Sequence, residues 1–99
     1  MYLRNYLENQ VKNAHPLDHV IMLYNRAIAC LKIAKKAIED GLKDPENIRK
    51  KAENIGKATE IIAYLQGSLN MEKGGEIAKS LKIIYDILIG ELVKANLEN

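Results

Sequence analysis

Residues 70–96, NMEKGGEIAKSLKIIYDILIGELVKAN, decide the fold that we expect for this chain. Asn70 suits a helix cap, and Glu72 places an acidic side chain in the first turn, where the helix dipole favours it. Apolar residues then recur at three- and four-residue steps, which is typical of one helix face. They are Ile77, Leu81, Ile84, Leu88, Leu92 and Ala95. We therefore expect a long helix over residues 71–97.

Gly74 and Gly75 lie just inside that start. Each glycine costs roughly 1 kcal/mol relative to alanine in a helix interior. The pair therefore requires a reason, and three are open: a late helix start, a bend, or another backbone passing close by.

The residues before this stretch predict a second long helix, over residues 45–67. Asp44-Pro45-Glu46 supplies an acidic cap, a proline at the first position and an acid after it, and Gly67 marks the end. The expected apolar stripe is Ile48, Ala52, Ile55, Ala58 or Thr59, Ile62, Leu65 and Leu69. The expected polar face is Arg49, Lys50, Lys51, Glu53 and Lys57.

A further long helix is predicted over residues 16–40. Pro16 suits the first helical position with His15 at the cap, and Gly41 suits a C-terminal stop. The expected apolar face is Val20, Ile21, Tyr24, Ala27, Ile28, Leu31, Ala34 and Ile38, widened by Met22, Leu23 and Ile33.

Residues 1–13 form a short amphipathic piece, in which Tyr2 and Tyr6, and also Leu3 and Leu7, are four residues apart. A helix of about a dozen residues is marginal in water on its own, so this arm should be stable only when docked. Two alternatives are open: an arm packed permanently on its own bundle, which the spacing alone favours, and a detachable arm that covers a groove.

The fold class that follows is all-α: an antiparallel up-down bundle of three long helices plus a short N-terminal helical arm, in one domain over residues 1–99. Short connections make neighbouring long helices antiparallel. Hydrophobic residues are 47% of the chain and charged residues 28%, which indicates a globular protein.

Composition excludes several classes of function. A net charge of +2, with lysines interleaved among acids, is too mild to indicate nucleic-acid binding. No apolar run approaches the roughly 20 residues of a membrane span, so we expect no membrane insertion. The N-terminus lacks the apolar run of a signal peptide. Cys30 is the single cysteine and we expect it to be buried, which suits a reduced, cytoplasmic protein.

The residues that could carry chemistry are sparse. His15 and His19 have the four-residue spacing of a helical metal site, with Asp18 nearby, but His15 is the expected cap and no further ligand is close. The glycine pair lacks the preceding strand and the following Gly-Lys-Ser/Thr of a phosphate loop. We therefore expect no catalytic residues, no metal and no cofactor, and an interaction module instead of an enzyme.

The stretch Glu72, Lys73, Gly74, Gly75, Glu76, Ile77 and Ala78 resembles the hallmark motif of the flagellar secretion chaperones, the FliS family. The tyrosine pair of the arm and residues 22–28, MLYNRAI, are similar to further family motifs. Departures are His15 in place of a Ser or Thr cap, Asn25 in place of an acid, and Arg26 in place of glycine.

The resemblance implies a cytoplasmic bundle that holds the C-terminal segment of flagellin, prevents its premature polymerisation and presents it to the flagellar export gate, without catalysis or cofactor. For that role we expect the flagellin groove to use Leu17, Ile21, Tyr24, Ile28, Ile84 and Leu88. We expect the arm to contact the groove or the gate through Tyr2, Leu3, Tyr6 and Leu7.

One departure is large, because the family continues past Ala95-Asn96 into another long helix and this sequence stops at Asn99. A truncated chain, a naturally short member and a fragment are all open. With that side vacant, Ile83, Ile87, Ile89 and Val93 should face water, which predicts a homodimer, formed for instance by exchange of a helix across residues 67–75. The rival function is a structural or self-associating helical module without chaperone activity, with a phosphotransfer or metal-binding bundle as a more distant alternative.

Overall fold

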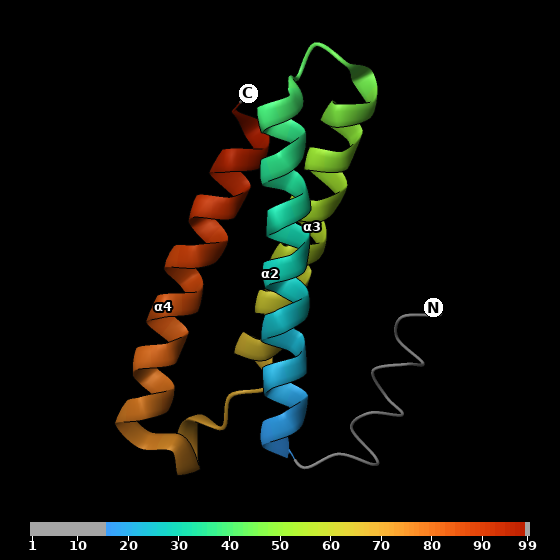
Figure 1. The fold of residues 1–99 in the computed structure, drawn as a ribbon. Helices are drawn as coiled ribbons and strands as arrows, with labels where there is room; N and C mark the ends of the chain where they lie inside the picture. Colours follow the sequence, from blue (N-terminus) through green and yellow to red (C-terminus); the bar gives the residue numbers. More distant parts are fainter. Residues whose placement is uncertain (1–15, 99) are drawn as a thin grey trace.

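Three antiparallel helices make up the part of the chain that the computed structural model describes, residues 16–98 with side chains from residue 18 onward. They are α2 (Pro16–Asp40), α3 (Pro45–Gly67) and α4 (Met71–Leu97), and no strand occurs in this range. The chain reverses direction at each short connection, so α2 and α4 run one way and α3 the other (Figure 1). The prediction of an all-α, up-down bundle of three long helices is confirmed, whereas the N-terminal arm lies outside the described residues.

The local signals at the helix ends act as predicted. The Asp44 side chain accepts a hydrogen bond from the backbone N–H of Glu46 at 2.9 Å, and Pro45 follows at the first helical position. The Asn70 side chain accepts the N–H of Lys73 at 2.9 Å. Gly41 adopts a φ of 112°, a backbone conformation that residues other than glycine rarely adopt, and α2 ends before it.

The helix α3 is the centre of the bundle. It packs against both α2 and α4, whereas the Cα atoms of α2 and α4 remain more than 8 Å apart. In the described residues α2 and α3 each contribute five buried apolar residues and α4 contributes two, and Ala58 of α3 is fully buried. The buried cluster joins Leu23, Ala27 and Cys30 of α2, Ala58, Ile61, Ile62 and Leu65 of α3, and Tyr85 of α4. The predicted burial of Cys30 is confirmed.

The predicted apolar face of α2 is wrong in part. Ile21, Tyr24, Ile28 and Ile38 are exposed, and only Leu23, Ala27 and Ala34 of the expected residues are buried. Cys30 and Ala37 complete the buried side of the helix. The distance between the axes of two packed helices depends on the size of the side chains at their contact. The small side chains on this face therefore let α2 pack closely on α3, and Leu23 is the one large side chain in the described part of α2 that is buried there.

The predicted stripe of α4 is wrong in part: Leu81 and Leu92 pack against the core as predicted, but the other contacts come from the residues that follow Ile77, Ile84 and Leu88. Ala78 and Tyr85 are buried and Leu81, Ile89 and Leu92 pack against the core, whereas Ile77, Ile84 and Leu88 are exposed. Ile83, Ile87 and Val93 are exposed, as predicted. Ile89 was also predicted to face water, but it packs against the core. Apolar residues occur on several sides of this helix, so periodicity alone did not identify the side that packs.

Lys51 of α3, predicted on the polar face, is only 3% exposed. Its Nζ donates a hydrogen bond to the backbone carbonyl of Glu98 at 2.7 Å, just beyond the last turn of α4. A cation is favourable at a helix C-terminus, where backbone carbonyls lack helical partners. Ile48 and Ala52, predicted in the apolar stripe, are exposed instead.

The glycine pair produces a bend near the start of α4. Gly75 has φ 54° and ψ −133°, a non-helical conformation that interrupts the helix. A Cβ atom added at Gly74 would lie 2.6 Å from the Cβ of Ala78, which is too close. Of the three reasons considered for the pair, the structure shows the bend, and Gly74 is required by close packing beside it.

Alanine at these glycines should destabilise the fold, in contrast to alanine elsewhere on the same helix. We expect Gly75→Ala to lower the free energy of unfolding by about 1–3 kcal/mol, because alanine is strained at that φ. Gly74→Ala should cost a similar amount, about 1–3 kcal/mol, through overpacking against Ala78. Urea unfolding followed by circular dichroism measures both.

The matched control is Gly90→Ala, because Gly90 lies in α4 with open space around its Cβ position. This variant should gain about 0.5–1 kcal/mol from helix propensity. Equal effects of all three substitutions would contradict the assigned roles of Gly74 and Gly75.

Candidate partner-binding face

A pair of tyrosines joins α2 to α4. The hydroxyls of Tyr24 and Tyr85 are hydrogen-bonded to each other, and their ring centroids are 6.5 Å apart. Tyr85 is buried, at 4% exposure, whereas Tyr24 is 36% exposed. Among residues 18–98 this is the one side-chain hydrogen bond between the two helices, so it marks where their otherwise separate surfaces meet.

The exposed residues of α4 near this pair lie on the side away from α3. Gln66 of α3 donates from Nε2 to the Asp86 carboxylate at 2.6 Å and to the Lys82 carbonyl at 3.1 Å, which places α3 beside those residues. Each residue turns a helix by about 100°, so Ile84 and Leu88 fall on the opposite side of Tyr85. They are 49% and 41% exposed.

The exposed residues of α2 next to Tyr24 likewise lie on the side of their helix away from α3. Ile21 and Ile28 are one turn before and after Tyr24 and lie on the side of it away from Leu23 and Ala27, which face α3. Each is 49% exposed. We use the name α2–α4 face for these residues together with those of α4: Ile21, Tyr24, Ile28, Ile84 and Leu88.

The α2–α4 face therefore contains five of the six residues predicted to line a groove. The sixth, Leu17, falls in the first turn of α2, and its side chain is outside the described part of the structure. The arm residues Tyr2, Leu3, Tyr6 and Leu7 are also outside the described residues. What the arrangement offers is an apolar surface with a polar hydroxyl pair at its boundary with the core.

Tyr85 is the residue of this region that sequence reasoning missed, since the apolar stripe expected for this helix did not include it. Burial, and then the hydrogen bond with Tyr24, raise the pKa of Tyr85 to about 12. The phenol therefore remains neutral at ordinary pH and adds no charge beside an apolar surface. The signal available in the sequence was a large aromatic residue one position beyond the expected aliphatic stripe.

The motif residues Glu72, Lys73, Gly74, Gly75 and Glu76 lie at the bend of α4, not on the α2–α4 face. Glu76 forms an exposed ion pair with Lys79 at 3.5 Å, and Glu72 lies in the first turn. An exposed pair of this kind contributes little stability. The structural contribution of the motif is therefore the backbone conformation at Gly74 and Gly75, which bends α4.

Residues 16–98 contain neither a cluster of metal ligands nor a membrane-spanning helix. No group of three His, Cys, Asp or Glu residues in this range could hold a metal ion, although His15 lies outside it. Within the same range, no helix is long and apolar enough to cross a membrane. The fold and its exposed apolar face thus define a small helical module suited to binding other protein segments.

The comparisons with known proteins identify the family. The sequence profile described as "Flagellar protein FliS" matches residues 1–99. The chain is 38% identical over 98 residues to the flagellar secretion chaperone FliS of Vibrio cholerae, covering 99% of this chain and 68% of that protein. It is 36% identical over 99 residues to the FliS of Salmonella typhimurium, covering 99% of this chain and 70% of that protein. The chain belongs to the FliS family of flagellar secretion chaperones.

The alignment to the Bacillus subtilis member, at 34% identity over 94 residues, covers 95% of this chain and 65% of that protein. The chain thus spans about two thirds of the length of these relatives. The resemblance noted from the sequence motifs is confirmed.

We expect Tyr85→Phe to lower the free energy of unfolding by about 0.5–1.5 kcal/mol, through loss of the hydrogen bond to Tyr24. Because folding raises the pKa of Tyr85 from 10.0 to about 12, the corresponding stabilisation is present below pH 10 and is lost as the pH rises toward 12. Absorbance of tyrosinate against pH in the folded protein should show a late step, near pH 12, that the variant lacks. Tyr64→Phe is the control, since Tyr64 is 47% exposed, and it should leave the late step intact.

Proposed function

We propose that this protein is a cytoplasmic export chaperone that binds the C-terminal segment of flagellin, prevents its premature polymerisation and aids its delivery to the flagellar export gate. The observation that carries the proposal is the α2–α4 face of a protein in the FliS family. The relatives are named flagellar secretion chaperones, which supports a role in export. The role is binding and delivery, without a chemical step.

The geometry of the face suits a helical segment. Exposed apolar side chains lie along α2 over residues 21–28 and along α4 over residues 84–88, on the same side as the tyrosine pair. An amphipathic helix binds such a surface by placing its own apolar side chains between two helices. Each large aliphatic side chain that becomes buried contributes roughly 1.5–3 kcal/mol before the costs of association.

A partner that is disordered before binding also requires an extended apolar contact. Ordering such a segment opposes binding by roughly 2–5 kcal/mol or more, so several side chains must be buried to offset it. The five residues of the α2–α4 face supply contacts on two helices. A chaperone with this surface holds its partner in a conformation in which the partner's own apolar residues are covered.

Calorimetric titration with a peptide of the flagellin C-terminal segment tests the proposal. We expect saturable binding with a negative heat-capacity change from apolar burial. Ile84→Asp and Leu88→Asp should each weaken the affinity by roughly tenfold or more, as expected where a central apolar contact is worth above about 1–2 kcal/mol.

Ile48→Asp is the control for these substitutions, because Ile48 of α3 is 43% exposed, close to the 49% of Ile84, and lies outside the α2–α4 face. It should leave the affinity unchanged. A folded sample that shows no heat of binding at high micromolar peptide would refute the proposal. Equal losses of affinity for Ile48→Asp and Ile84→Asp would show that the peptide does not bind at the α2–α4 face.

Self-association without chaperone activity is the second candidate, and a different surface favours it. Ile83 and Ile87 are each 60% exposed and lie almost half a turn from Tyr85, on the outer side of α4. A helix with apolar residues on nearly all sides is normally covered by other helices. A second copy of the chain, packed on this outer side, would form a symmetric homodimer.

Sedimentation equilibrium over a wide concentration range measures this association. The homodimer predicts a mass that rises with concentration, and Ile83→Glu combined with Ile87→Glu should shift the equilibrium to monomer. A folded monomer at tens of micromolar would exclude self-association as the main role, and leaves the flagellin titration as an independent test.

A further inference from the structure

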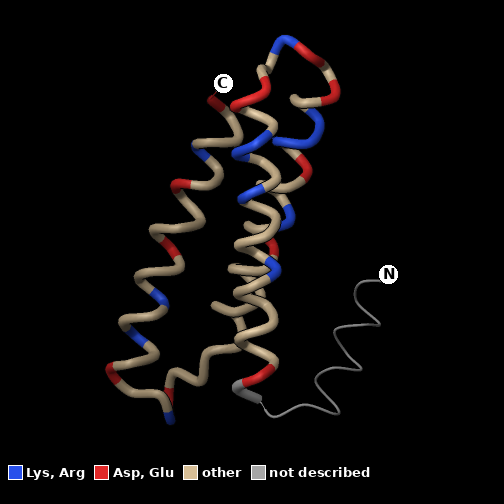
Figure 2. Tube along the Cα trace, viewed as in Figure 1, with Lys and Arg blue, Asp and Glu red and all other residues tan. Residues whose placement is uncertain are grey.

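Charge is distributed unevenly along the bundle. Residues 32–57, which contain the α2–α3 connection and the helix turns beside it, hold eight lysine or arginine residues and five acids, a net of +3. Residues 58–98 hold four basic and six acidic residues, a net of −2. Figure 2 shows basic residues gathered along α2 and α3 toward the end where they are connected. The mild charge of the whole chain therefore conceals a basic end.

The acids at that end are mostly engaged already. Lys36 pairs with Asp40 at 2.9 Å, and this ion pair raises the pKa of Lys36. Lys35 pairs with Glu39 at 4.0 Å, and Arg49 pairs with both Glu46 and Glu53. In contrast, Lys32 and Lys50 have no carboxylate within 4.0 Å among the described residues. The pKa of Glu46 is lowered mainly by its hydrogen bond with Arg49 and also by the charge of Lys50, but neither Lys32 nor Lys50 is held in a close ion pair in this part of the chain.

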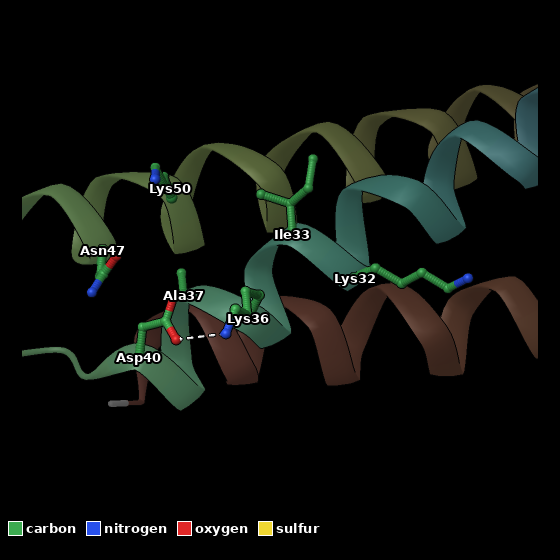
Figure 3. A pocket seen from close by; sticks show the side chains of 7 residues that line it. All are labelled: Lys32, Ile33, Lys36, Ala37, Asp40, Asn47 and Lys50. Carbon is green, nitrogen blue, oxygen red and sulfur yellow. Dashed lines mark ion pairs between the residues drawn. The ribbon is translucent and has the colours of Figure 1, made fainter.

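These two lysines border a pocket of about 290 Å³ between α2 and α3. Its apolar residues are Ile33, 47% exposed, and Ala37, which is buried. Lys36 and Asp40 line it from α2, and Asn47 lines it from α3. In Figure 3, Lys36 is turned toward Asp40, while Lys50 and Asn47 come from the neighbouring helix. Asn47 is fixed by a hydrogen bond from its Nδ2 to the carbonyl of Gly41 at 2.9 Å.

The pocket is separate from the α2–α4 face. Ile33 follows Tyr24 by nine residues, which is about two and a half turns and places it on the opposite side of α2. Ile33 and the pocket floor therefore lie on the opposite side of α2 from the tyrosine pair, whereas Lys32, one turn after Ile28, lies between the pocket and the α2–α4 face. A ligand of this pocket is additional to the proposed flagellin segment.

The lining determines what chemistry fits. A bare anion would gain little from Ile33, Ala37 and the aliphatic parts of lysine side chains, which favour an apolar group. Two cations that form no ion pair within 4.0 Å in the described residues favour carboxylates next to that group. We propose that this pocket docks an acidic protein segment, which inserts one apolar side chain between α2 and α3 and places flanking carboxylates against Lys32 and Lys50.

Binding of such a segment should be weak and sensitive to salt. Exposed ion pairs contribute about 0.2–1 kcal/mol each, and at physiological ionic strength they are screened beyond about 8 Å. The apolar insertion must supply the remaining affinity. Raising the salt concentration should therefore weaken binding without abolishing it, whereas removal of the apolar side chain from the segment should abolish it.

Titration of the ¹⁵N-labelled 99-residue chain by NMR, with the capped peptide Asp-Asp-Leu-Asp-Asp as the probe, tests the proposal. We expect saturable shift changes confined to the amides of residues 32–40 and 47–50. Asp-Asp-Ser-Asp-Asp keeps the charge without the apolar group, and Lys-Lys-Leu-Lys-Lys keeps the apolar group with the opposite charge. Neither should reproduce the response.

Two charge reversals and a matched control locate the site. Lys32→Glu and Lys50→Glu should each weaken the apparent affinity roughly three- to tenfold, because an attraction is replaced by a repulsion. Lys94→Glu makes the same charge change on α4, also without an ion-pair partner within 4.0 Å in the described residues, and should have no effect. Circular dichroism of each variant confirms that it is folded.

Several results would overturn the proposal. They are the absence of localised shifts at 10 mM probe, equal responses to the serine or lysine peptide, and equal losses for all three variants. The same shifts with inorganic phosphate or a short single-stranded oligonucleotide would indicate a general anion site instead of a peptide pocket. Since the probe contains no flagellin sequence, failure here does not bear on the chaperone proposal.

Discussion

The close packing of α3 between its two neighbours is the constraint on which the rest of this structure depends. Ala58 is fully buried at its centre, and α2 contributes Ala27, Ala34 and Ala37 to the contact. Small side chains bring helix axes together but bury little apolar area each. The larger aliphatic residues of α2 and α4 are consequently left on the outside, so the same packing that holds the bundle together produces its exposed apolar surfaces.

Helix ends were predictable from the sequence because they depend on local chemistry. Asp44, Pro45 and Asn70 act through hydrogen bonds and backbone geometry within a few residues, and Gly41 acts through its own φ. The packed side of each helix was less predictable, because α2 and α4 carry apolar residues on more than one side. Periodicity finds a stripe but does not say whether that stripe meets the core or a partner. Lys51 was misassigned because nothing local shows that a helix C-terminus lies beside it.

The structure places the expected groove residues on the surface, and their role in binding a partner stays a prediction. Ile21, Tyr24, Ile28, Ile84 and Leu88 were expected both in the apolar stripes of their helices and, from the family resemblance, in a groove, and they are exposed. Their meeting on one side of the bundle depends on Tyr85, which is hydrogen-bonded to Tyr24 across a sequence separation of 61 residues. A hydrogen bond at that separation is a property of the fold and has no local signature.

The bend at Gly75 links the family motif to this arrangement. A straight helix through residues 71–97 would fix the direction of the α3–α4 connection together with that of the long part of α4. The non-helical Gly75 lets the first turn follow Asn70 while the remainder of α4 aligns with α3. Tyr85 then lies ten residues further on, with its ring buried against the core and its hydroxyl at Tyr24. The glycine pair is therefore far from the apolar face and still sets its geometry, because the direction of one helix decides which of its sides remains open.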